Sequence, residues 1–248
     1  MIKSALQYIV GLNESKVRDI TLPDGTVQTY SDKPLSRLSK HIPMATTHIK
    51  MCTLTSLIDY IKAKVDELPQ KMIIHVESPT EVSFYSALNE ERERELIATV
   101  KANIPSFSYG EFIGHESFII GVQAKFVNDT ATDKELILKF AGTVEAGTVA
   151  EYGDDGVTQK ATVKQGIASK TEAIVPNPVN LRPYRTFAEV DSPASNFIFR
   201  MKQDKYSDGI SCALFEADGG AWKNEAMQNV KLYLEKHLEG FDNIIVIS

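Results

Sequence analysis

Apolar residues at helical spacing mark the clearest helix of the chain, about a quarter of the way along the sequence. Leu54, Leu57, Ile58, Ile61, Val65 and Leu68 fall at offsets of 0, 3, 4, 7, 11 and 14 residues. These offsets place them along one side of a helix with 3.6 residues per turn. Because Pro69 cannot continue a helix, the pattern predicts a helix over residues 54–68.

A second apolar stripe predicts a helix near the C-terminal end of the sequence. Its members are Trp222, Ala226, Val230, Tyr233, Leu234 and Leu238. We expect this side of the helix to be buried against a sheet, and we interpret Trp222 as a core residue rather than a ligand-stacking one.

Two shorter helices are predicted from capping signals. Ser108 is followed three residues later by Glu111, and Thr132 by Glu135. In a capping box with this spacing, the two side chains satisfy backbone N–H groups at the start of a helix. Each pair therefore predicts a helix that begins one residue after its first member.

Alternating or continuous apolar runs predict strands in the rest of the chain. From Val157 to Ile167 apolar and polar residues alternate, as in a strand with one buried face. Asp24-Gly25 favours a tight turn and predicts a hairpin between residues 17–22 and 26–30. Further strands are predicted over residues 46–51, 72–76, 81–88, 95–101, 197–203, 209–217 and 244–247, and the runs 197–203 and 209–217 form a second hairpin.

These patterns together predict an α+β protein with mixed and antiparallel sheets, about four helices and an extended N-terminal arm. Prolines at positions 23, 34 and 43 interrupt the first segment, so we expect residues 1–45 to form the arm with its hairpin. Residues 46–248 are expected to form the α+β body, with two lobes divided near residues 130–155. A chain of 248 residues can bury such a core without disulfides.

Charge and cysteine content narrow the classes of partner and compartment. Lys and Arg number 27 against 33 Asp and Glu, which gives a net charge of −6. Nucleic acid and anionic lipid attract cationic surfaces, so we do not expect a general attraction to either. Two cysteines, Cys52 and Cys212, cannot form a disulfide framework or a four-thiolate zinc site. The sequence contains neither a secretory signal nor the ~18 consecutive apolar residues that a membrane span requires. We therefore expect a cytoplasmic protein without a membrane partner.

The common catalytic and phosphate-binding motifs do not occur in the sequence. There is no G-x-x-x-x-G-K-[ST], G-x-G-x-x-G, G-x-S-x-G or H-E-x-x-H. His75 with Glu77, and His115 with Glu116, offer too few ligands for a metal site, and we interpret them as ordinary polar residues. We expect no catalytic residue, no cofactor and no metal.

Acidic residues near the end of the second hairpin allow two interpretations. Asp204, Asp208, Glu216 and Asp218 could gather oxygen ligands for Mg²⁺ or Ca²⁺. However, Asp218-Gly219-Gly220 also suits a turn from a strand into a helix, because Asp is favourable near a helix N-terminus and glycine adopts positive φ. We favour the turn.

The chain has one concentration of basic residues, and aromatic residues are interleaved with it. The candidate interface or phosphate-binding residues are Arg182, Tyr184, Arg185, Arg200 and Lys202. Such a strand surface could hold phosphate or stack bases. Because Arg and aromatic residues are also enriched at interfaces, we favour an oligomer interface or a set of ion pairs within the chain.

Five continuous stretches resemble the YfdQ-like proteins, a family of uncharacterised function carried by phages and prophages. They are His75–Val82, Asp154–Gln159, Val175–Val179, Leu181–Phe187 and Leu214–Trp222. The resemblance covers about residues 45–239 and implies a phage or prophage origin, with a bacterial host cell as the compartment. It supplies no catalytic motif, so it assigns no site residue.

Three functions are compatible with these observations. The first is a non-enzymatic, self-associating homo-oligomer, because arms and edge strands such as residues 244–247 gain stability by pairing with neighbours. One version of it is a shell similar to the HK97-like major capsid proteins of tailed phages, although the helix at residues 54–68 is short for their long helix. The alternatives are an accessory factor of phage DNA recombination or replication that binds single-stranded DNA, and a counter-defence protein that binds a nucleotide or a host protein.

The behaviour of the N-terminal arm distinguishes the self-assembly hypothesis from the ligand-binding hypotheses. A segment interrupted by prolines and with few apolar runs buries little surface by itself. We therefore expect residues 1–45 to be ordered by packing on a neighbouring subunit, and their deletion to lower the oligomeric state while residues 45–240 stay folded.

Overall fold

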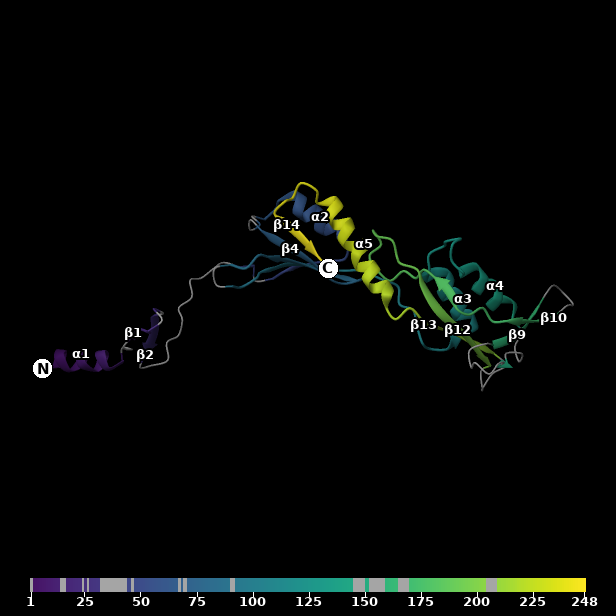
Figure 1. Cartoon of the computed structure of the whole chain (residues 1–248), viewed down its shortest axis with the longest axis horizontal. Coiled ribbons are helices and arrows are strands. Elements are labelled where there is room, and N and C mark those ends of the chain that lie inside the picture. The colour runs from purple at the N-terminus through teal and green to yellow at the C-terminus, as the bar shows by residue number, and fades with distance from the viewer. Residues whose placement is uncertain are drawn as a thin grey trace. The chain divides into compact units, whose positions relative to one another are not determined.

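The computed structural model describes residues 2–13, 17–23, 25, 27–31, 44–45, 47–66, 68, 71–89, 92–144, 150–151, 159–164, 170–203 and 209–248. The chain forms two compact units, unit 1 (residues 1–44) and unit 2 (residues 45–248). Within the described residues the protein has five helices and both antiparallel and mixed sheets (Figure 1), which confirms the α+β class with one helix more than expected.

Unit 1 contains a helix and a hairpin. Helix α1 (Ile2–Asn13) precedes the antiparallel strands β1 (Val17–Thr21) and β2 (Val27–Ser31), which pair in the register Val17↔Ser31 to Thr21↔Val27. The hairpin is confirmed, and Gly25 in its turn has φ +84°, a conformation that glycine adopts without strain. Helix α1 was not predicted, because the apolar residues of that segment show only weak periodicity.

The first part of unit 2 is built on a five-stranded sheet with the order β14-β4-β5-β6-β3. The outer strands β14 and β3 run parallel to their neighbours, and the three central strands are antiparallel. Helices α2 (Leu54–Ala63) and α5 (Ala221–His237) contact this sheet and each other. Its strands are β3 (Ile49–Met51), β4 (Met72–Ser78), β5 (Glu81–Ser86), β6 (Leu96–Lys101) and β14 (Ile244–Ile247).

Most of the apolar stripe of each helix is buried on this sheet. Leu57 of α2, Phe84 of β5 and Val230 of α5 are fully buried in one core. Trp222 at the start of α5 is only 9% exposed, which confirms the prediction of a core tryptophan. We call residues 45–102 together with 221–248 the sheet lobe.

Helix α2 ends earlier than the apolar spacing predicts. It stops at Ala63 rather than residue 68, because Lys64 adopts the left-handed conformation (φ +50°) and its N–H donates to the Ile61 carbonyl. Val65 is then 74% exposed and lies outside the stripe. The helix therefore ends five residues before the predicted stop.

Residues 103–220, which we call the inserted lobe, carry a second core. A sheet of order β11-β12-β13-β7 and a small sheet of order β10-β9-β8 are packed with helices α3 and α4. The elements are β7 (Ile113–Gly114), α3 (His115–Lys125), α4 (Lys134–Thr143), β8 (Ala150–Glu151), β9 (Gln159–Lys164), β10 (Lys170–Ile174), β11 (Val179–Leu181), β12 (Ser195–Gln203) and β13 (Ile210–Glu216).

The predicted division of the body near residues 130–155 is wrong. Phe118, Ile137 and Ala161 lie before, within and after that segment, and all three belong to the core of the inserted lobe. The chain instead leaves the sheet lobe after β6 and returns to it at α5, so the inserted lobe interrupts the sheet lobe in sequence.

The two capping signals have different outcomes. Helix α4 begins at Lys134, one residue later than the pair Thr132 and Glu135 predicts, and its N-cap residue is Asp133, while the Thr132 hydroxyl donates to the Asp129 carbonyl. The prediction of a helix near residue 109 is wrong, because Gly110 has φ +76° and donates its N–H to the Leu214 carbonyl of β13. Helix α3 begins only at His115. The predicted strands and the hairpin of β12 and β13 are confirmed, with some ends shifted by a few residues. Of the strand predicted over residues 157–167, residues 159–164 form β9, and the others lie outside the described residues.

Candidate functional site

The five candidate basic and aromatic residues come from two neighbouring segments of the inserted lobe. Arg182, Tyr184 and Arg185 lie on the loop between β11 and β12, and Arg200 and Lys202 lie on β12 itself. Backbone hydrogen bonds join this loop to the end of α3, since Tyr184 donates to the Lys125 carbonyl. The Thr186 hydroxyl donates to the Pro79 carbonyl in the turn between β4 and β5, so both lobes hold the loop.

Arg182 is held by acidic residues of the same chain. Its guanidinium lies 3.1 Å from Asp129 Oδ2 and 3.3 Å from Asp191 Oδ1, and its Nε donates to the Ser192 carbonyl. One cation therefore faces two carboxylates, which leaves this group with net negative charge. A phosphate would have to displace both carboxylates to bind Arg182.

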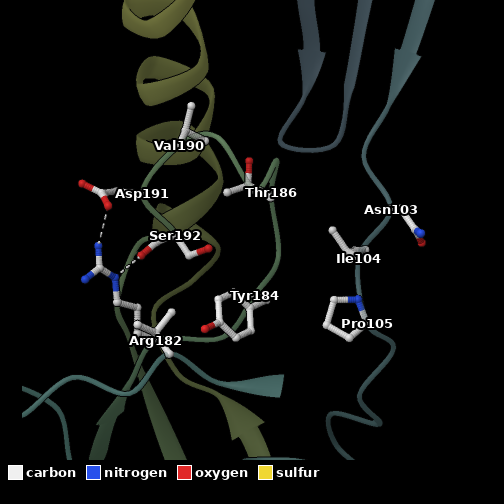
Figure 2. Close-up of a pocket in the computed structure, with 11 residues that line it drawn as sticks. Asn103, Ile104, Pro105, Arg182, Tyr184, Thr186, Val190, Asp191 and Ser192 are labelled. Carbon is white, nitrogen blue, oxygen red and sulfur yellow. Dashed lines mark hydrogen bonds and ion pairs between the residues drawn. The ribbon is translucent and has the colours of Figure 1, made fainter. Parts of the chain in front are cut away.

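A cavity of about 370 Å³ opens beside Arg182 (Figure 2). It lies between the segment that leaves β6 and the loop that carries Arg182, and Tyr184 faces Ile104 and Pro105 across it. Val190 and Thr186 contribute to its wall. Its charged lining residues, Arg182 and Asp191, form an ion pair, so an anion in the cavity would compete with Asp191 for the guanidinium.

Arg185 points away from solvent into the junction of the two lobes and is only 5% exposed. Its guanidinium donates to Glu216 Oε1 at 2.6 Å and to the Ser195 hydroxyl at 2.5 Å. The same group lies 3.8 Å from the centre of the Trp222 ring and 5.5 Å from that of Phe197. This geometry fits a cation–π contact that joins β12, β13 and α5.

Opposing effects act on the charge of this buried group. Burial lowers the pKa of Arg185, while nearby Tyr109, Glu216 and Asp218 raise it again. Tyr109 stacks on Phe197 with ring centres 5.7 Å apart, and burial raises the pKa of its hydroxyl. Arg185 is thus a structural cation within a polar and aromatic cluster.

Asp218 lies in the predicted turn between β13 and α5. Its carboxylate accepts hydrogen bonds from the Ser195 hydroxyl and from the amides of Gly220 and Trp222. Burial alone would raise the pKa of Asp218, but these hydrogen bonds and Arg185 hold it below its usual range. Gly219 and Gly220 both have positive φ, as the turn interpretation requires.

The other candidate ligands do not form a metal site in the part of the chain that the structure describes, where no group of three or more acidic, His or Cys side chains gathers. His75 and Glu77 form a single contact of 4.0 Å, and His115 contacts the Ala141 carbonyl. Asp204 and Asp208 lie outside the described residues.

The two residues on β12 do not join the loop residues in one surface. Lys202 extends over the ring of Phe112, with its Nζ 4.2 Å from the ring centre. Arg200 is half-buried on the same face of β12, opposite to the buried Phe199 and Met201. The sequence-predicted cluster therefore separates into a clamped Arg182, a buried Arg185 and a distinct face of β12.

Four residues of this region were not among the sequence candidates. Asp129, Asp191, Tyr109 and Ser195 supply the partners of Arg182 and Arg185. The acidic excess of the chain indicates that basic residues will find carboxylate partners, but no local pattern identifies which ones.

Comparisons of the chain with protein-family models, with curated proteins and with solved structures found no match. Within the residues that the structure describes, no helix is both long and apolar enough to cross a membrane.

Proposed function

We propose that the protein is a non-enzymatic component of phage or prophage origin that assembles into a homo-oligomer through unit 1. The observation that carries the proposal is the exposure of apolar side chains in this unit. They are Leu6 (57% exposed), Tyr8 (69%), Val17 (51%), Ile20 (49%), Val27 (61%) and Tyr30 (50%).

The described side chains of unit 1 show little packing against one another. Those of α1 (residues 3–8 and 11) and of β1 are all exposed. An isolated helix of this length is marginal in water, and so is an isolated two-stranded hairpin. Both elements would be stabilised by packing their apolar side chains on another surface, and a second copy of the chain supplies one.

The phage or prophage origin is supported by the resemblance to the YfdQ-like proteins. Two of the stretches that carry it, Leu181–Phe187 and Leu214–Trp222, contain Arg185 and its partners Glu216 and Trp222. We do not extend the proposal to an HK97-like shell, because α2 ends at Ala63 and is even shorter than the sequence predicts.

Binding of single-stranded DNA or of a nucleotide has less support. Both functions would use the basic residues as phosphate ligands, yet Arg182 and Arg185 are each bound by carboxylates, and Arg200 and Lys202 lie on a separate face of β12. A cation already neutralised by neighbouring acids attracts a phosphate only weakly.

Light scattering coupled to size-exclusion chromatography tests the proposal. The full chain should elute as a dimer or larger species, and the double variant Leu6→Gln with Tyr8→Gln should shift it toward the monomer. Gln removes apolar area while keeping a good helix former. The matched control is Leu232→Gln, which removes an equally exposed leucine (61%) from α5 of unit 2. A monomeric full chain at high concentration, or equal masses for the double variant and the wild type, would contradict the proposal.

A further inference from the structure

The five-stranded sheet ends in an unprotected edge at β14. In the described part of the chain, β14 pairs with β4 on one side only. Its sequence, Ile244-Ile-Val-Ile247, has no charge and no proline, and Ile245 and Ile247 are 55% and 44% exposed. Edge strands of soluble proteins usually carry charges, proline or a covering segment, because a free edge pairs with other strands.

The hairpin β1–β2 would be stabilised by an additional strand. Two strands alone are marginally stable, and a third strand with an apolar face gives a sheet independent stability. Val17, Ile20, Val27 and Tyr30 are exposed on this hairpin, and in the described part of residues 1–44 no third strand pairs with it. The hairpin therefore lacks a strand, and the sheet of unit 2 offers one.

The two units also carry opposite net charge. Residues 1–44 contain six Lys and Arg against four Asp and Glu, a net charge of +2. Residues 45–248 hold the remaining 21 basic and 29 acidic residues, a net charge of −8. Opposite charges favour encounters between unit 1 of one copy and unit 2 of another, and the like charges of two copies of unit 2 disfavour direct contact between their sheets.

We propose that the β1–β2 hairpin of one copy adds to the β14 edge of a second copy and extends its sheet by two strands. This inference rests on the self-assembly proposed above and names the surface that accepts the arm. Backbone hydrogen bonds supply affinity in such strand addition, and the exposed isoleucines of β14 supply an apolar contact. The contact is head-to-tail, since the donor and acceptor surfaces differ.

The test uses two variants of the full chain that disable opposite sides of the contact. Ile245→Lys with Ile247→Lys places charges on the edge, a substitution that blocks edge pairing. Ile20→Pro with Thr29→Pro interrupts both strands of the hairpin. The matched control is Ile49→Lys on β3, the opposite edge of the same sheet, where the isoleucine is 41% exposed.

We expect each double variant to run as a monomer, and the Ile49→Lys variant to keep the wild-type mass. An equimolar mixture of the two double variants should form a dimer that grows no further, because one copy retains an intact edge and the other an intact hairpin. The fluorescence of Trp222 should match that of the wild type in every variant, which shows that the sheet lobe is folded.

Three outcomes would overturn the inference. If the β14 variant assembles like the wild type, the edge is not the acceptor, while self-assembly stands. If both double variants are monomeric and their mixture stays monomeric, the hairpin does not pair with a second copy. If the wild type is itself a monomer, the proposed function falls as well.

Hydrogen exchange on the unmodified chain gives a second measurement that needs no substitution. The amides of residues 17–31 and 244–247 should gain protection together as the protein concentration rises. Protection of one segment without the other would overturn the proposed pairing.

Discussion

Replacement of Arg185 should destabilise unit 2 more than any other substitution among the five candidate residues. The alanine variant removes the hydrogen bonds to Glu216 and Ser195, and it removes the cation stacked on Trp222. It also leaves a void where a side chain that is 5% exposed had packed.

The expected loss of stability depends on the hydrogen bonds of Arg185 and on how exposed its partner Glu216 is. Hydrogen bonds to charged groups contribute about 1.5–3 kcal/mol each, and a buried cation over an aromatic ring contributes about 2 kcal/mol. The Glu216 side chain is 39% exposed and regains water when Arg185 is removed, which offsets part of this loss. We therefore expect a decrease of about 3 kcal/mol in the free energy of unfolding, the lower end of the range for a broken buried ion pair.

Arg182→Ala is the comparison variant. Arg182 is 25% exposed and its partners Asp129 and Asp191 are 29% and 89% exposed, so water replaces more of the lost contacts than at Arg185, and we expect a cost of about 1–2 kcal/mol. Urea unfolding followed by Trp222 fluorescence measures both variants, because the chain has a single tryptophan and Arg185 lies against it. If the Arg185 variant loses no more stability than the Arg182 variant, the assignment of Arg185 as a structural cation is wrong.

Three further predictions concern single groups. Burial raises the pKa of Cys212 to about 12, so at pH 8 a thiol reagent should modify the exposed Cys52 rapidly and Cys212 only after unfolding. The pKa of Asp218 is lowered in the folded state, so this carboxylate stabilises the protein above its unfolded pKa, and the contribution is lost as the pH falls through the folded pKa. Asp218→Asn should therefore lower the free energy of unfolding by about 1 kcal/mol at pH 7 and flatten the acid side of a pH–stability curve. Thermal unfolding should show that Gly220→Ala (φ +82°) destabilises by about 1 kcal/mol while Gly142→Ala, in open space within α4, stabilises by about 0.5 kcal/mol.

Local signals predicted elements well where tertiary contacts did not compete with them. The Asp24-Gly25 turn led to a correct hairpin, and the pair Thr132 and Glu135 predicted the start of α4 to within one residue, although the N-cap residue is Asp133 and no side chain caps the helix. The same capping spacing at Ser108 failed, because the Gly110 amide hydrogen-bonds to β13 instead of to a helical carbonyl. Propensity over a few residues cannot anticipate such a long-range partner.

The candidate site was only half predictable for the same reason. Composition identified Arg182 and Arg185 as unusual in an acidic chain, and interleaved aromatic residues pointed to stacking. Their role depends on partners distant in sequence, since Arg182 meets Asp129 and Arg185 meets Glu216. Which carboxylate neutralises which cation is decided by strand order and loop path, and neither has a local signature.

The parallel pairing of β14 with β4 has a consequence for synthesis of the chain on the ribosome. Met72 of β4 aligns with Ile244 of β14, so about 170 residues must be translated between the two strands. The inserted lobe has its own core and emerges in full before α5 and β14. At ordinary translation rates the strands β4 to β6 wait roughly 10–30 s for the helix and the strand that complete their core. During that interval α2 can cover only part of the apolar face of these strands, and the part on β4 that α5 covers in the folded protein stays open to solvent or to a chaperone.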